Sequence, residues 1–213
     1  MTYYALKIVS RVLVAFLLLP VHEFAHAWAA YKLGDYTANY SGRLTLNPFA
    51  HFHPIGTLLL IFTGYGWAKP VPVNPRNFKN QKIGMGLTAL AGPVSNILMS
   101  FVLLLVCKVI TLIPVYNFQT ANVISTLIGV FSFMAQTSVV LAVFNLIPVP
   151  PLDGSRVLGL VLPDRIYFKI MQYERYIYIV LMVLVLVRVL DTPIYFISDA
   201  IFNLLLTLTG LGG

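Results

Sequence analysis

Long apolar runs recur along the whole chain and limit what it can fold into. Inside a bilayer, every backbone N–H and C=O group must find a partner within the protein. Runs of about 20 apolar residues therefore fold as membrane-spanning helices. The apolar runs fall at about residues 4–33, 54–66, 84–112, 122–148, 174–190 and 193–209. The pattern predicts an all-α polytopic membrane protein.

The number of spans follows from the length of the chain. Its 213 residues are 59% hydrophobic and only 10% charged, which leaves room for five or six spans at about 20 residues each. Helix breakers interrupt the short second run at Pro54, Gly56, Gly64 and Gly66. We expect a re-entrant segment there, and the choice between five and six spans stays open.

The chain is predicted to form a single integral-membrane domain over residues 1–213. Its catalytic core would cover about residues 4–158, because the motifs described below lie there. No motif is found in the last two apolar runs, for which we expect a C-terminal helical hairpin at about 170–210. No linker is long enough to divide the chain.

The net charge of +7 comes largely from basic residues near the ends of the predicted spans. The positive-inside rule explains such a distribution, so we expect the lipid bilayer as a partner and no nucleic acid. The loops at about 69–82 and 156–175 are strongly basic, whereas residues 113–121 carry no charge. The basic loops are therefore predicted to lie in the cytoplasm.

The first apolar run contains His22-Glu23-Phe24-Ala25-His26. Ionisable side chains at membrane depth are costly and usually mark a functional site. Histidines four residues apart share one face of a helix and can hold one metal ion. Glu23 is placed to act as a base on water rather than as a ligand. The motif predicts a zinc hydrolase that works within the bilayer.

A catalytic zinc ion usually has three protein ligands and one open position. The single cysteine excludes a multi-thiolate site. Most other acidic residues fit turns, span ends or ion pairs: Asp35, Asp164, Glu174, Asp191 and Asp199. Asp153 differs, because three prolines before it break the end of an apolar run, and broken backbone at membrane depth lines a cavity or is buried in protein. We expect Asp153 as the third ligand of one Zn²⁺ per chain.

Two segments after the first run have open roles. Arg43-Leu44-Thr45-Leu46 alternates polar and apolar residues and predicts a short β-strand near the active site. It is either a loop edge or an edge that pairs with an extended substrate. His51 and His53 are either ordinary hydrogen-bonded histidines of a loop or part of a second metal or substrate-gating site.

These motifs resemble those of the site-2 protease family of intramembrane zinc metalloproteases, in the short bacterial form without a PDZ domain. The carrying motifs are His22-Glu23-Phe24-Ala25-His26 and Asn145-Leu146-Ile147-Pro148-Val149-Pro150-Pro151-Leu152-Asp153-Gly154, with support from residues 42–48, 66–75 and 91–96. One departure is His53, where related short members are expected to have an aspartate.

The resemblance implies that His22, His26 and Asp153 ligate zinc and that Glu23 is the general base. It also implies that Asn145 lies near the active site, where it would bind substrate or the developing oxyanion, or else serve as a helix-packing amide. The implied enzyme is a zinc metalloendopeptidase of the bacterial cytoplasmic membrane. It would cleave transmembrane protein substrates in or near their helices, with its active site toward the cytoplasmic side.

Two other functions stay open. The first is a non-catalytic metal-binding membrane protein, namely a transporter or a degenerate protease acting as a chaperone, which would not need Glu23. The second is a prenyl-protein-type zinc peptidase, whose third ligand is a glutamate. Glu174 would have to serve as that ligand.

Overall fold

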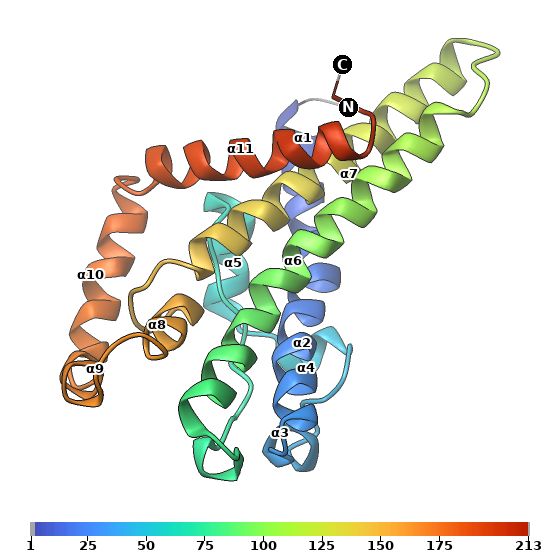
Figure 1. Cartoon of the computed structure of the whole chain (residues 1–213). Coiled ribbons are helices and arrows are strands. Elements are labelled where there is room, and N and C mark those ends of the chain that lie inside the picture. Colours follow the sequence, from blue (N-terminus) through green and yellow to red (C-terminus); the bar gives the residue numbers. More distant parts are fainter. Residues whose placement is uncertain (1–2, 213) are drawn as a thin grey trace.

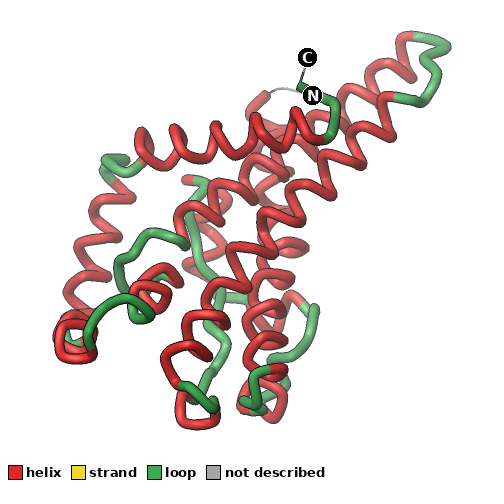
Figure 2. The backbone as a smooth tube through the Cα atoms, in the orientation of Figure 1, coloured by secondary structure: helices red, strands yellow, loops and turns green. Residues whose placement is uncertain are grey.

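The computed structural model describes residues 3–212, and these form helices joined by loops, without a strand (Figures 1 and 2). The elements are α1 (Tyr3–Leu13), the π-helix η1 (Val14–Leu18), α2 (Leu19–Lys32), α3 (Thr37–Tyr40), α4 (Pro48–His51), α5 (Pro54–Thr63), the 3₁₀ helix η2 (Pro75–Asn77), α6 (Gln81–Thr111), α7 (Phe118–Asn145), α8 (Asp153–Leu158), α9 (Asp164–Met171), α10 (Glu174–Leu186) and α11 (Asp191–Leu208). The predicted all-α class is confirmed.

Three helical stretches of the described chain are long and apolar enough to cross a membrane: Tyr3–Lys32, Gln81–Thr111 and Phe118–Asn145. The first consists of α1, η1 and α2 without a break. Helices α10 and α11 meet the same criterion only together, and they give a fourth span if the pair counts as one. The described residues thus support three or four spans rather than the five or six expected. Helix α5 has 10 residues and is too short to cross a bilayer.

The C-terminal helices differ from the expected hairpin. Helices α10 and α11 are bent by 79° at the short break between them, so they lie nearly perpendicular to each other. Arg188 in this break has a left-handed backbone with φ of 63°. Helix α11 packs against α7 and α6 instead of folding back along α10 (Figure 1). The packing partner of α11 therefore sets its direction.

The long helices α6 and α7 run antiparallel through the middle of the molecule, with α2 packed on α6 and α1 on α7 (Figure 1). Side chains from these helices fill the core, among them the fully buried Val14, Leu104, Met134, Val139 and Leu141. Burial of large aliphatic side chains at native density fixes the distances between helices. The face of α2 that carries the two histidines is consequently held against α6.

Arg11 ties the first span to α5. Its side chain is buried and donates hydrogen bonds to the carbonyls of Ile61, Phe62 and Thr63 at 3.1, 3.0 and 3.2 Å. The last carbonyls of a helix lack partners within the helix, and a cation at that end also complements the helix dipole. A charge inside an apolar span is accommodated in this way, and it fixes the end of α5.

The predicted proline break is confirmed. Helix α7 ends at Asn145 and α8 begins at Asp153, with Pro148, Pro150 and Pro151 between them. A Cβ atom on Gly154 would lie 2.2 Å from the carbonyl oxygen of Leu146. The start of α8 therefore packs directly on the end of α7, and only glycine permits this contact. The chain reversal brings Asp153 back toward α6 and α2.

The strand expected at Arg43–Leu46 does not form, and the segment is an irregular loop. Its polar groups bond to the short helices on either side, since the Arg43 N–H donates to the Ala38 carbonyl of α3 at 2.8 Å and the Thr45 carbonyl lies 2.8 Å from Nε2 of His51 in α4. A strand needs a second strand to pair with, and none is present in residues 3–212. Period-two alternation alone did not determine the structure here.

Candidate metal centre

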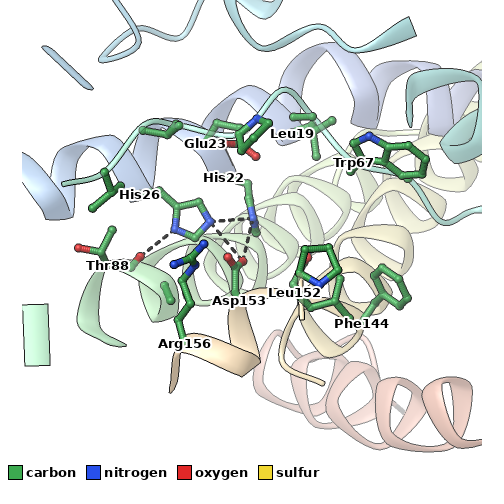
Figure 3. A pocket seen from close by; sticks show the side chains of 18 of the residues that line it. Leu19, His22, Glu23, His26, Trp67, Thr88, Phe144, Leu152, Asp153 and Arg156 are labelled. Atoms are coloured by element: carbon green, nitrogen blue, oxygen red, sulfur yellow. Dashed lines mark hydrogen bonds and ion pairs between the residues drawn. The ribbon is translucent and has the colours of Figure 1, made fainter. Parts of the chain in front are cut away.

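His22, His26 and Asp153 meet at one point, although the two histidines lie far from Asp153 in the sequence (Figure 3). Both histidines lie on α2, and Asp153 is the first residue of α8. The Nε2 atoms of His22 and His26 are 3.0 Å apart. They lie 3.3 and 3.2 Å from Asp153 Oδ2, respectively. The residues predicted from the sequence to share a site are thus brought together by the fold.

The spacing of these three atoms fits one zinc ion. Zinc bonds of about 2.0–2.2 Å in a tetrahedron place neighbouring ligand atoms roughly 3.3–3.5 Å apart. The three observed separations, 3.0, 3.2 and 3.3 Å, are close to this value. Three protein ligands also leave the fourth position open, as in catalytic rather than structural zinc sites.

A backbone carbonyl of helix α6 fixes the tautomer of the neutral His26 ring. The Nδ1 atom of His26 lies 2.7 Å from the backbone carbonyl of Thr88, which can only accept a hydrogen bond. Nδ1 therefore carries the proton, and Nε2 of the neutral ring presents a lone pair toward Asp153 Oδ2. Two acceptors 3.2 Å apart repel each other unless a cation lies between them. The donor set therefore fits a metal cation, and the Thr88 carbonyl supplies the outer contact that metal-ligating histidines usually have.

The electrostatic setting of Asp153 favours its charged form. Burial raises the pKa of the Asp153 carboxyl, but positive charge at the imidazoles of His26 and His22, with their hydrogen bonds, lowers it more strongly, to below its ordinary value. A metal cation held by neutral imidazoles would lower this pKa in the same direction. A carboxylate is the form that binds metal.

Gly92 allows α6 to approach the two imidazoles. A Cβ atom at this position would lie 2.3 Å from His26 Nε2 and 2.6 Å from the Cε1 atom of His22. No side chain fits there without displacing the rings. The stretch at 91–96, which supported the resemblance, therefore contains a residue that forms one wall of the centre.

The centre opens into a cavity of about 280 Å³ whose wall is largely apolar. Glu23 lies in this wall, beside His22, and is 8% exposed. Among the described residues, no hydrogen bond or salt bridge holds its carboxylate. The carboxylate is therefore free to accept a proton from a water in the cavity.

Asn145 also lines the cavity, at the last position of α7. Its side-chain N–H donates to the Leu141 carbonyl at 3.0 Å, one turn earlier in the same helix. In the described part of the chain its side-chain oxygen has no partner. The side-chain nitrogen of Asn145 thus bonds within the helix, and its side-chain oxygen can bond a group in the cavity.

An extended segment at residues 64–74 lines the cavity and contributes Trp67, Ala68 and Val71 to its wall. Two buried charges hold it. Arg43 donates to the carbonyls of Lys69 and Pro70.

Asp35 holds the far end of this segment. It accepts hydrogen bonds of 2.7 Å from the Asn74 N–H and from the side chain of Asn77. Burial raises the pKa of Asp35, but these bonds and those from Thr37 lower it to below its ordinary value. The loop residue Asp35, just past α2, is therefore a structural anchor.

His51 and His53 do not reach the centre. His51 Nε2 bonds the Thr45 carbonyl, and the His51 carbonyl accepts from Lys69 N at 2.8 Å. His53 caps α5 by accepting from Gly56 N at 3.2 Å. In residues 3–212 the one group of three or more potential ligands is His22, His26 and Asp153. Both histidines therefore bond to nearby backbone and form no second metal site within the described residues. The substrate-gating role stays a prediction.

Several residues of the site were not predicted from the sequence. Thr88, Gly92 and Arg156 line or support the centre from α6 and α8. Sequence signals existed for Gly92, which lies in the supporting motif at 91–96, and for Arg156, which lies three residues after Asp153 on the same helix face. Glu174, the ligand that a prenyl-protein-type peptidase would need, begins α10 and does not line the cavity.

Comparisons with known proteins identify the family of this chain. The model of peptidase family M50 matches residues 107–188, which include Asp153. The chain is 41% identical over 184 residues to a Bacillus subtilis (strain 168) protein provisionally named zinc metalloprotease YwhC, and the match covers 85% of this chain and 83% of that protein.

More distant relatives match a shorter region. The chain is 29% identical over 141 residues to the provisionally named zinc metalloprotease Rip2 of Mycolicibacterium smegmatis, and 30% identical over 140 residues to that of Mycobacterium tuberculosis. It spans about half of the length of each. No solved structure matches the chain. Because the Bacillus relative is similar over most of both proteins, this chain belongs to peptidase family M50, the site-2 protease family.

Proposed function

We propose that this chain is a zinc-dependent endopeptidase that hydrolyses peptide bonds in or near the transmembrane helices of membrane-protein substrates. The observation that carries the proposal is the convergence of His22, His26 and Asp153 at 3.0–3.3 Å beside the free carboxylate of Glu23. Membership in the M50 family and the names of the relatives support a metalloprotease that uses zinc.

In this proposal His22, His26 and Asp153 hold one zinc ion. When bound, zinc supplies a Lewis acid that lowers the pKa of water and polarises a carbonyl group. The Glu23 carboxylate takes a proton from water and later gives it to the leaving amine nitrogen. The free side-chain oxygen of Asn145 accepts a hydrogen bond from the backbone of the substrate.

The extended segment at 64–74 is proposed to hold the substrate. A helical substrate keeps its amides in internal hydrogen bonds and must unwind before it can be cut. Trp67, Ala68 and Val71 have no hydrogen-bond partner for their backbone groups in the described part of the chain. An unwound substrate can pair with these groups as an added strand. This segment takes the place of Arg43–Leu46, which we had expected to offer such an edge.

We propose a bacterial cytoplasmic membrane as the location, with the centre toward the cytoplasmic side. The basic loops lie at the end of the molecule where α2 ends and α6 begins, close to the centre, whereas the uncharged loop between α6 and α7 lies at the opposite end (Figure 1). Basic loops face the cytoplasm in most membrane proteins.

The test compares cells that carry wild-type protein, Glu23→Gln or the control Glu174→Gln. Membrane-bound peptide fragments are identified by mass spectrometry, and zinc is measured on the purified proteins. We expect Glu23→Gln to keep its zinc and to lower fragment release by on the order of 10²-fold or more, because the general base is lost. Glu174→Gln should retain both its zinc and wild-type release of fragments. If Glu23→Gln releases the wild-type fragments, the chain is a metal-binding protein without this catalysis.

A further inference from the structure

Arg156 reaches the same cavity as the candidate ligands. It lies on α8 three residues after Asp153, so both side chains leave the same face of the helix. Figure 3 shows its guanidinium pointing from α8 toward the cluster of His22, His26 and Asp153. It is the one lysine or arginine among the described residues that line the cavity.

Arg156 has no partner among residues 3–212, although it is half-buried. The other buried arginines of the described chain, and some of its lysines, have partners. Arg11 and Arg43 donate hydrogen bonds to backbone carbonyls, and Lys82 Nζ lies 2.6 Å from Asp164 Oδ1. A half-buried cation without a partner in a largely apolar cavity is costly. Its position is explained if an anion forms or binds at the centre.

We propose that Arg156 is a further catalytic residue, which binds the negative oxygen that develops on the substrate carbonyl. This role rests on the proposed peptidase function. As the water oxygen bonds to the carbonyl carbon, the C=O electron pair moves onto the oxygen, and Arg156 donates N–H groups to it. When the C–N bond breaks, that pair re-forms the C=O, and the amine leaves with the proton from Glu23.

The fold gives Arg156 the properties that such a group needs. Donors stabilise a developing charge best when they are already in place, because no reorganisation is then required. Arg156 and the ligand Asp153 share one short helix, so their relative position is set by helix geometry. The planar guanidinium also offers two parallel N–H groups, which a lysine cannot match.

The test uses the full-length protein in detergent with cobalt in place of zinc, because cobalt has a visible spectrum. Inorganic phosphate serves as an anionic probe and imidazole as a neutral one. The variants are Arg156→Gln and Arg156→Lys, with Arg165→Gln as control, since Arg165 is an exposed arginine on α9 outside this cavity. Cobalt content is measured for each protein.

We expect Arg156→Gln to weaken phosphate binding at least about tenfold, because a charge-assisted hydrogen bond is lost. Its imidazole binding should stay within about twofold of wild type, with unchanged cobalt content. The phosphate affinity of Arg156→Lys should fall between those of wild type and Arg156→Gln. Arg165→Gln should bind both probes as wild type does. Wild-type phosphate affinity in Arg156→Gln, equal weakening for both probes, or a cobalt-loaded wild type that binds no phosphate would overturn the proposal.

A second measurement separates this role from substrate recognition. A synthetic transmembrane peptide, chosen from the fragments found in cells, is cleaved at steady state. Arg156→Gln should lower kcat by on the order of 10²-fold with little change in KM. A raised KM with unchanged kcat would refute the oxyanion role. If the wild-type protein itself binds no zinc or cobalt, the peptidase proposal fails, independently of Arg156.

Discussion

Replacing Gly92 with alanine tests whether the close approach of α6 positions the metal ligands. The new methyl group would lie 2.3 Å from His26 Nε2, whereas ordinary contacts begin at 3.4 Å, so the ring must move by about 1.1 Å. The methyl group would also lie 2.6 Å from the Cε1 atom of His22. The shift demanded of the His26 nitrogen far exceeds the tolerance of metal–ligand distances, which is about 0.2 Å.

The expected loss of zinc affinity in Gly92→Ala is large and specific to the centre. Disturbing the groups that orient metal ligands typically weakens metal binding 10–100-fold, or by about 1.4–2.8 kcal/mol. The displacement here acts on the ligands themselves, so we expect Gly92→Ala to reach the upper part of this range. Alanine favours a helix by about 1 kcal/mol over glycine, so the helix itself should not be weakened.

The assay is competition for zinc between the purified protein in detergent and a chelator of known affinity. Gly129→Ala on α7 is the matched control, because its Cβ atom would meet Leu6 at 3.4 Å, an ordinary contact. Circular dichroism checks that both variants remain helical. If Gly92→Ala binds zinc as tightly as Gly129→Ala does, the two imidazoles are not the ligands that α6 positions, and our assignment of the centre is wrong.

Three further predictions concern the ligand and the anchors of the extended segment. Asp153→Ala should lose its zinc, measured as metal per protein, whereas Glu174→Ala should keep it; equal zinc in both would exclude Asp153 as a ligand. Arg43→Gln should lower the free energy of unfolding in denaturant by roughly 1.5–3 kcal/mol, because buried charged hydrogen bonds are lost; an unchanged midpoint would contradict this role. The pKa of Asp35 lies below its ordinary 3.8, so its carboxylate stabilises the fold above that pH, and this contribution disappears as the pH falls through the lowered value. The difference in melting temperature between wild type and Asp35→Asn should therefore shrink between about pH 5 and pH 3, and a constant difference would refute this account.

The sequence predicted the parts of the centre that depend on local geometry. Two histidines four residues apart share a helix face whatever surrounds them. The prolines at 148, 150 and 151 end α7 wherever it lies, because they lack a backbone N–H. The identities of the three candidate ligands therefore followed from spacing and from the scarcity of acidic residues. Apolar length likewise predicted helices for the whole chain.

Elements whose structure depends on a distant partner were not predicted. Arg43–Leu46 alternates like a strand but finds no strand to pair with in the described part of the chain, and Arg43 instead holds the segment at 64–74. The last two helices bend by 79° because α11 packs on α7 and α6 rather than along α10. Apolar length also failed to give the number of spans, since it does not show where a helix bends.

The sequence by itself determined the helical class and a pair of histidines with one fitting carboxylate. Only the tertiary structure decided that the three ligand atoms meet within 3.3 Å, that Gly92 lets α6 press against the imidazoles and that Arg156 reaches the same cavity without a partner among the described residues. The physical reason is that backbone hydrogen bonding and helix periodicity act over a few residues. The distance between α2 and α8 is set by close packing among side chains that lie far apart in the chain.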